Sequence, residues 1–213
     1  MIENAKNRGQ TPAFAGMTVS QLLAALASPD PTPGGGTAAA IAGAMGASLL
    51  VMVAGLAKSK HNTDEEKAAL STARQALEPI VAALTDLADR DTTAFDAVMA
   101  AYRLPKATDD EKAARTRQIQ AALRGATEVP LETLRACVAA IDHGRVVQDF
   151  GNPSAESDAG VAMGLLRAAA DGAAANVRIN LVSLKDENFK ASADAETDRL
   201  RSAAAASQHA GGR

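Results

Sequence analysis

Tryptophan is absent from this chain of 213 residues, and aromatic side chains together make up only 2% of it. Strands are typically rich in aromatic and β-branched residues, whereas the alanine runs of this sequence favour closely packed helices. The length suits one domain with a sizeable core. We therefore predict an all-α fold, a bundle of about six to eight helices whose core helices are rich in alanine and glycine.

The chain also lacks a strong charge excess and any metal-binding motif. Its formal net charge of -3 gives no general attraction to phosphate backbones, and no basic stripe carries aromatic side chains for stacking bases. The single Cys137 cannot form an internal disulfide, and neither a CxxC nor an HExxH motif occurs. Nucleic acid and metal are therefore not expected as partners, and a reducing cytoplasm is the expected compartment.

Neither an export signal nor a membrane span is expected. The polar N-terminus lacks the apolar run of a secretory signal, so we predict a disordered tail over residues 1–17, followed by a single helical domain over 18–208. Residues 37–57 carry no charge and are long enough to span a bilayer, but small residues dominate them, which favours a buried helix. Its small residues are expected to form a subunit contact: Gly43, Gly46 and Ala47.

Helix starts are marked by three capping boxes, in which Thr is followed three residues later by Gln or Glu: Thr18 and Gln21, Thr63 and Glu66, and Thr108 and Glu111. Pro130 should kink or restart the helix that begins at Thr108, and Gly144 should end it. Together with the apolar periodicity, these signals predict helices over about the following residues: 18–28, 37–57, 63–101, 108–144, 155–184 and 186–206.

The most unusual loop contains three prolines and three glycines between Ser28 and Gly36, directly before a helix. Backbone amides at a helix N-terminus favour anions, and Gly34, Gly35 and Gly36 would let a ligand approach them closely. The same glycines would equally serve a tight turn at a crowded helix contact. The segment lacks the GxxxxGK[ST] pattern of a nucleotide-binding P-loop.

A second polar turn leads from Asn152 through Ser157 and Asp158 into an apolar helix. Ser157 as a helix cap and Asp158 as a first-turn charge would have purely structural roles. Further along, Asn176 and Asn180 stand four residues apart and therefore share one helix face. Because a buried amide is costly without a partner, both must bond either to neighbouring backbone or to a ligand.

Cationic side chains gather beyond the ends of two predicted helices: Lys58, Lys60, His61, Arg103 and Lys106. Such charges either complement helix C-termini in solvent or receive an anion. Asp89 and Asp91 lie two residues apart on a helix, so only one of them is expected to point inward. Tyr102, the single tyrosine, packs either in the core or on an aromatic ligand.

Taken in order along the chain, these features resemble the cyclodeaminase/cyclohydrolase family, which includes formiminotetrahydrofolate cyclodeaminase and the stand-alone methenyltetrahydrofolate cyclohydrolases. The segments that carry the resemblance, between Thr18 and Asp186, are Pro31–Thr37 with the Ala/Gly-rich helix after it, Asp91 with Ala94–Met99, Ala101–Lys106, Asp110–Arg115, Val129–Leu131, Gly151–Asn152, Ser157–Ala162 and Asn176–Asn180. Where family members often carry a Gly-Lys-Lys-Lys-Tyr-like stretch, this chain has Ser59–Thr63 and matches only at Lys60. The resemblance implies an all-α homodimer with a tetrahydrofolate substrate, no further cofactor and no metal.

In 5,10-methenyltetrahydrofolate the one-carbon unit is an amidinium carbon, which is electrophilic without a metal. Its hydrolysis to 10-formyltetrahydrofolate requires a base for the attacking water, donors for the tetrahedral centre and a proton for the departing pterin nitrogen. The resemblance implies that Asp158 is the base or the partner of the cation and that Asp91 is the second carboxylate, with exchangeable roles. The implied substrate-binding residues are Gly34, Gly35, Gly36, Lys60, Lys106, Asn152, Ser157, Asn176 and Asn180.

Hydrolysis is favoured because the chain carries no formiminotransferase domain and because Ala101–Arg115 is most similar to the stand-alone cyclohydrolases. A first alternative is cyclodeamination of formiminotetrahydrofolate with release of ammonia, which passes through the same tetrahedral carbon. A second alternative is a non-catalytic helical dimerisation module. Saturating folate should stabilise an enzyme by a few kcal/mol and leave such a module unchanged.

Overall fold

The computed structural model describes residues 14–56 and 62–206, and all regular structure within them is helical. The predicted all-α fold is confirmed, and the six α-helices of the described residues lie within the predicted number. The elements in chain order are η1 (Phe14–Gly16), α1 (Val19–Leu26), α2 (Gly35–Gly55), α3 (Asp64–Tyr102), α4 (Asp109–Phe150), η2 (Pro153–Ala155), α5 (Glu156–Leu181) and α6 (Glu187–Ala206).

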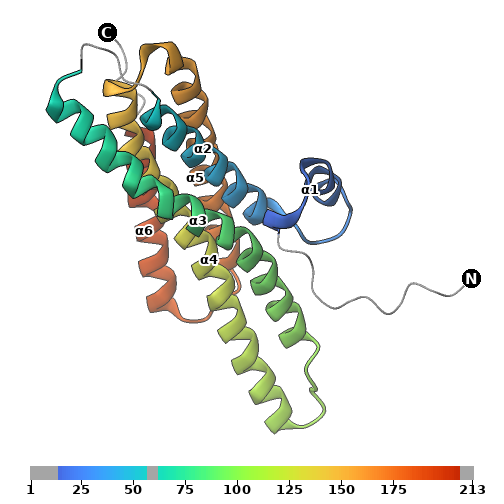
Figure 1. The fold of residues 1–213 in the computed structure, drawn as a ribbon. Helices are drawn as coiled ribbons and strands as arrows, with labels where there is room; N and C mark the ends of the chain where they lie inside the picture. Colours follow the sequence, from blue (N-terminus) through green and yellow to red (C-terminus); the bar gives the residue numbers. More distant parts are fainter. Residues whose placement is uncertain (1–13, 57–61, 207–213) are drawn as a thin grey trace, which may run out of the picture.

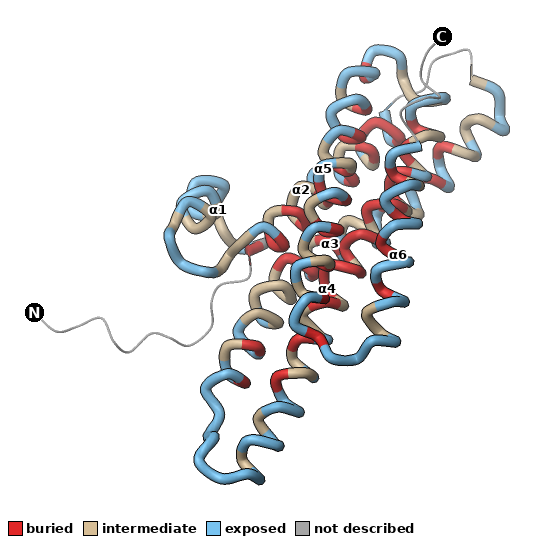
Figure 2. The backbone as a smooth tube through the Cα atoms, turned by 180° about the vertical axis from the view of Figure 1, so that it is seen from behind, coloured by how far each residue is buried: buried red, intermediate tan, exposed pale blue. Residues whose placement is uncertain are grey.

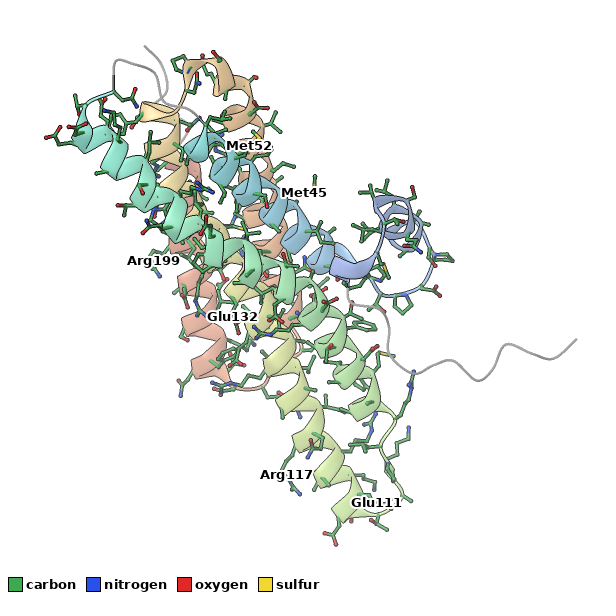
Figure 3. All side chains as sticks on the ribbon, viewed as in Figure 1. Met45, Met52, Glu111, Arg117, Glu132 and Arg199 are labelled. Carbon is green, nitrogen blue, oxygen red and sulfur yellow. The ribbon has the colours of Figure 1, made fainter. Side chains whose placement is uncertain are left out.

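Four long helices form the body of the molecule. Helices α2, α3, α4 and α5 each pack on the next, α5 closes the ring on α2, and α6 covers α4 and α5 (Figure 1). The buried residues follow the inward faces of these helices (Figure 2). Helix α1 stands away from the bundle, and the α3–α4 hairpin extends beyond the other helices, with Glu111 and Arg117 near its free end (Figure 3). The arrangement is an up-down-up-down bundle with additions.

The three predicted capping boxes are present. Thr18, Thr63 and Thr108 each accept a hydrogen bond from the backbone amide three residues later, and the side chain at that later position accepts one from the backbone of the Thr. Each pair satisfies two amides that the first helical turn would otherwise leave without partners. The starts of these three helices, α1, α3 and α4, are therefore set by local sequence.

The prediction that Pro130 restarts a helix is wrong, because α4 runs through it without interruption, whereas the predicted kink stays a prediction. Proline has no N–H to donate to the carbonyl four residues earlier, which belongs to Ala126. The side chain of Asn180 on α5 replaces that donor, with Nδ2 2.7 Å from the Ala126 oxygen. A tertiary hydrogen bond thus compensates the local cost of the proline.

Gly144 does not end α4 either. A Cβ at this position would lie 2.9 Å from a methyl carbon of Leu50, so the glycine permits close packing of α4 on α2. The predicted terminator is therefore a packing residue within a continuous helix. A glycine in the middle of a helix carries an entropic cost, which the close contact offsets.

The subunit contact predicted at Gly43, Gly46 and Ala47 is also wrong. A Cβ at Gly43 would lie 2.9 Å from the sulfur of Cys137, a Cβ at Gly46 would lie 2.7 Å from the carbonyl oxygen of Ala162, and Ala47 is fully buried. These small residues face the interior of the same chain. Although α2 is long and apolar enough to cross a membrane, it packs on α3, α4 and α5 as a core helix of the bundle.

The predicted tail ends earlier than residue 17. Phe14 is buried, and its amide donates to Asp89 Oδ1 at 2.8 Å, which fixes η1 on α3. The rest of the tail prediction, residues 1–13, lies outside the described residues, as do residues 207–213 and hence the predicted domain end at residue 208. The described body therefore begins at Phe14.

Candidate active site

The first turn of α2 meets α3 at a carboxylate. Gly34 caps α2 without a side-chain hydrogen bond, so the cap that Ser, Thr or Asp would normally supply is missing from this position. Asp91 of α3 lies there instead: Thr37 Oγ1 donates to Asp91 Oδ2 at 3.0 Å, and the backbone amide of Thr37 lowers the pKa of this carboxyl. A Cβ at Gly36 would overlap the Asp91 carboxylate, so the glycine is required for this close approach.

Asp91 is half-buried in a setting that alters its proton affinity. Burial raises the pKa of the Asp91 carboxyl, while the hydrogen bonds from Thr37 act in the opposite direction. A raised pKa brings a carboxylate closer to the range in which it can accept a proton during turnover. Perturbed carboxylates of this kind are common at functional sites, although structural networks also produce them.

Helix α5 brings Asn176 to the same place. A Cβ at Gly35 would lie 3.6 Å from Asn176 Nδ2, and that nitrogen donates to the Gly172 carbonyl at 2.8 Å. Asn180, one turn further, donates to the backbone of α4, so both amide nitrogens have backbone partners. We call the residues that meet here the Asp91 cluster: Gly35, Gly36, Thr37, Asp91 and Asn176.

Asp158 lies at the other end of α5. It precedes Asn176 by 18 residues, which at 1.5 Å per residue is about 27 Å along the helix. Asp158 is half-buried in the first turn of α5. The structure therefore does not bring the two predicted carboxylates, Asp91 and Asp158, together within one chain.

Asn152 and Ser157 accompany Asp158 at this end. Asn152 caps η2, because its Oδ1 accepts a hydrogen bond from the Ser154 amide at 3.0 Å. Ser157 is exposed and is not the cap of α5, because that position belongs to Ala155. Neither residue contributes to the Asp91 cluster of the same chain.

The cations predicted to receive the substrate lie apart from the Asp91 cluster or cannot be placed. Lys106 is exposed in the turn between α3 and α4, and Lys60 lies outside the described residues. Tyr102 is 44% exposed, with the Arg115 guanidinium 5.7 Å from its ring centre, so it is not a core residue. Tyr102 lies 11 positions after Asp91 on α3, which is about 16 Å along the helix.

An apolar groove, which the sequence did not reveal, runs between α2 and α3 with a volume of about 480 Å³. Met45 and Met52 project from α2 along it (Figure 3). Its lining is Phe14, Leu22, Ile41, Ala44, Met45, Ser48, Leu49, Met52, Val81, Thr85 and Ala88. Ala88, which lines this groove, is a neighbour of the Asp91 cluster, because its carbonyl oxygen lies 3.4 Å from Thr37 Oγ1.

Within residues 14–56 and 62–206, no group of three or more His, Cys, Asp or Glu side chains is placed to hold a metal ion. The residues of the Asp91 cluster offer one carboxylate, one hydroxyl, one amide and backbone groups. Such a set can hold a cation, accept a proton from water and donate hydrogen bonds to a tetrahedral centre. That the reaction needs no metal stays a prediction.

The fold resembles that of a solved folate enzyme. The structure of formiminotetrahydrofolate cyclodeaminase from Thermotoga maritima matches with a TM-score of 0.80 and 27% sequence identity, and the match covers 91% of this chain and 92% of that one. A helical bundle of this class is therefore shared between the two proteins.

Sequence comparison identifies the family. The family model of formiminotransferase-cyclodeaminase matches residues 18–199, and the chain belongs to this family. Methenyltetrahydrofolate cyclohydrolase from Methylorubrum extorquens is 47% identical over 172 residues, which cover 81% of this chain and 83% of that protein. Formimidoyltransferase-cyclodeaminase from Rattus norvegicus is 38% identical over 164 residues, 74% of this chain but only 29% of that longer protein.

Proposed function

We propose that this protein is a methenyltetrahydrofolate cyclohydrolase that converts 5,10-methenyltetrahydrofolate to 10-formyltetrahydrofolate. The proposal is supported by the cyclohydrolase that is 47% identical to this chain, because the match covers 83% of that protein. The observation that carries it is the half-buried Asp91 carboxylate, which a glycine-lined helix start and Asn176 surround. It provides a base in a setting where burial raises its pKa.

The reaction follows from the chemistry of that carboxylate. Water adds to the amidinium carbon while one of its protons passes to Asp91. The bond from this carbon to the pterin nitrogen then breaks, as the new hydroxyl loses its proton to form the formyl C=O and the nitrogen takes up a proton. The net reaction consumes one water and releases one proton. Before the attack, the ionised carboxylate also stabilises the cationic substrate beside it.

The position of Asp91 implies an orientation for the substrate. The α2 start, where Gly34, Gly35 and Gly36 were expected to receive an anion, already holds the Asp91 carboxylate, so a substrate carboxylate would meet a like charge there. We therefore place the amidinium at the Asp91 cluster and the glutamate end of the substrate towards Lys106. Lys60 retains its predicted contact with substrate.

The alternative activity is cyclodeamination of formiminotetrahydrofolate, in which the pterin nitrogen attacks the formimino carbon and ammonia leaves. The Thermotoga maritima structure and the longer rat protein carry names of this kind. Ammonia release from formiminotetrahydrofolate and absorbance loss from methenyltetrahydrofolate separate the two reactions on one preparation. Ammonia release without any hydrolysis would replace the cyclohydrolase by the cyclodeaminase.

The proposed function is tested with Asp91→Asn, which keeps the size of the side chain and removes the proton acceptor. Turnover of methenyltetrahydrofolate should fall roughly 100-fold or more with folding retained. Asp142→Asn is the matched control, because Asp142 is an exposed carboxylate on α4 whose surface ion pair contributes little. Normal turnover in a folded Asp91→Asn protein would show that Asp91 only caps α2.

We further propose a homodimer in which the apolar groove is covered by the same face of a second chain. A two-fold interface must be complementary to itself, and α2 carries no charge along its length, so two copies bring no like charges together. A two-fold axis across the middle of α2 would run the two helices antiparallel. The partner's Asp158 would then lie near the Asp91 end of this chain.

Hybrid dimers test whether Asp91 and Asp158 act in one site. When Asp91→Asn and Asp158→Asn chains are mixed and refolded together, half of the dimers contain one chain of each kind. A site shared between subunits remains intact once in each hybrid, so the mixture should recover about a quarter of the wild-type activity. No recovery would show that Asp158 does not complete the partner's site.

The predicted compartment remains the cytoplasm. Cys137 is a free, buried thiol, and its burial between helices is compatible with reducing conditions. The proposed partners are the folate substrate and a second copy of the chain, with neither nucleic acid nor membrane involved.

A further inference from the structure

The mechanism proposed above does not use Thr37, yet the hydroxyl of this buried side chain lies within hydrogen-bond distance of three acceptors. Thr37 is fully buried, and its Oγ1 lies 3.0 Å from Asp91 Oδ2, 3.4 Å from the Ala88 carbonyl and 3.5 Å from Thr92 Oγ1. A hydroxyl has one proton to donate. Asp91 is both the nearest of the three acceptors and the only charged one, so the proton is directed to it.

The backbone amide of Thr37 acts on Asp91 in the same direction as the hydroxyl, because both lower the pKa of the carboxyl. Thr37 stands in the first turn of α2, and its β-branched side chain has restricted rotamer freedom in a helix. The hydroxyl therefore holds the carboxylate from a defined position. Gly36 lets that carboxylate approach the helix closely enough to accept this bond.

We propose that Thr37 is a positioning residue whose hydroxyl holds the Asp91 carboxylate in its ionised form and directs it at the attacking water. The inference rests on the proposed function, because it assigns Thr37 a role through Asp91 as the base. Thr37 itself touches neither the water nor the substrate. A residue of the same shape without a hydroxyl is therefore not expected to replace it.

Charged neighbours do not compete with the hydroxyl for this role. Helix α2 carries no charge, and α5 presents the neutral Asn176 to the Asp91 cluster. Along α3, Asp89 accepts the Phe14 amide. Arg90, the adjacent cation, makes two hydrogen bonds to Glu132 of α4 at 2.7 and 2.8 Å. The balance at Asp91 is therefore set by burial, which raises its pKa, and by the donors of Thr37, which lower it.

Loss of the Thr37 hydroxyl should raise the pKa of Asp91, because it removes a donor that lowers it. Without it, the Asp91 carboxylate accepts a proton at higher pH, so the acidic limb of the pH–rate profile should move up by about 1 pH unit in Thr37→Val. Thr37→Ser retains the hydroxyl and should restore the wild-type limb. Thr197→Val is the matched control, because Thr197 is equally buried and its hydroxyl bonds only to the Ala193 carbonyl of its own helix.

The test combines pH–rate profiles of the four proteins with carboxyl-carbon NMR titration of Asp91, which needs no turnover. The expected result is an upward shift in Thr37→Val alone, seen by both methods. An unshifted Asp91 titration in a folded Thr37→Val protein, or the same shift in Thr197→Val, would overturn the proposal. A different result would be a shifted NMR titration in Thr37→Val together with no turnover of methenyltetrahydrofolate by the wild-type protein. The proposed function would then fail, and the role of Thr37 in positioning a base would fail with it. The hydrogen bond between Thr37 and Asp91 would still be established.

Discussion

Removing the Asn180 side chain should cost stability only because Pro130 interrupts the hydrogen bonding of α4. Pro130 has no amide proton, so the Ala126 carbonyl has no donor in its own helix and accepts from Asn180 Nδ2 at 2.7 Å. Asn180→Leu keeps a side chain of similar size and removes the donor. The half-buried carbonyl is then left without this partner.

The expected magnitude follows from that carbonyl. An unsatisfied buried acceptor costs about 1–3 kcal/mol, so Asn180→Leu should lower the free energy of unfolding by that amount. In a Pro130→Ala background the new amide donates to Ala126, and the same change should cost less than about 1 kcal/mol. The two substitutions should therefore be coupled by about 1–2 kcal/mol, whatever the effect of Pro130→Ala alone.

Urea unfolding of the four proteins measures this coupling, at one protein concentration because dimerisation would contribute to stability. Pro79→Ala provides the matched control: Pro79 also lies inside a long helix, α3, but it is exposed and water can reach the groups around it. Its effect should add to that of Asn180→Leu within about 0.5 kcal/mol. An equal cost of Asn180→Leu with and without Pro130 would refute the reasoning.

Three further outcomes are expected. Gly46→Ala should destabilise the protein by about 1–3 kcal/mol through overpacking. Gly164→Ala, whose Cβ meets nothing within 4 Å, should instead stabilise it by about 0.5–1 kcal/mol. Equal melting temperatures of the two variants would contradict the packing of α2. A chain that begins at Met17 should lose about 1.5–3 kcal/mol in urea unfolding, because it lacks the buried Phe14, and unchanged stability would show that this docking is unimportant. Burial raises the pKa of Cys137 to about 12, so a thiol reagent at mildly alkaline pH should label the chain only after unfolding; labelling of the folded protein would disprove that protection.

Part of the candidate site was named from the sequence, Gly35, Gly36 and Asn176 by residue type and Asp91 by the family resemblance. Gly35, Gly36, Asp91 and Asn176 come from three separate segments and meet in the Asp91 cluster. Thr37 was visible only as the end of the glycine loop, because its role depends on a carboxylate that is 54 residues away in the chain. Asp158 was grouped with Asp91 by resemblance, and no local pattern reveals the length of helix between it and Asn176.

The sequence by itself determined the all-α class and the starts of three helices, α1, α3 and α4. Capping is a local event, in which a Thr and a side chain three residues later satisfy amides of the same turn, so the pattern is decisive without tertiary contacts. The Ala-rich composition and the apolar periodicity act over a similarly short range. These signals require no knowledge of which helices become neighbours.

Only the tertiary structure decided what happens where local rules conflict with packing. Pro130 stays within α4 because Asn180 of another helix supplies the missing donor, and Gly46 faces the core because α5 requires its space. Helical spacing specifies which side chains share a face but not what that face meets. Close packing and hydrogen-bond satisfaction are properties of the assembled bundle, so the neighbours of each face arise only when the helices come together.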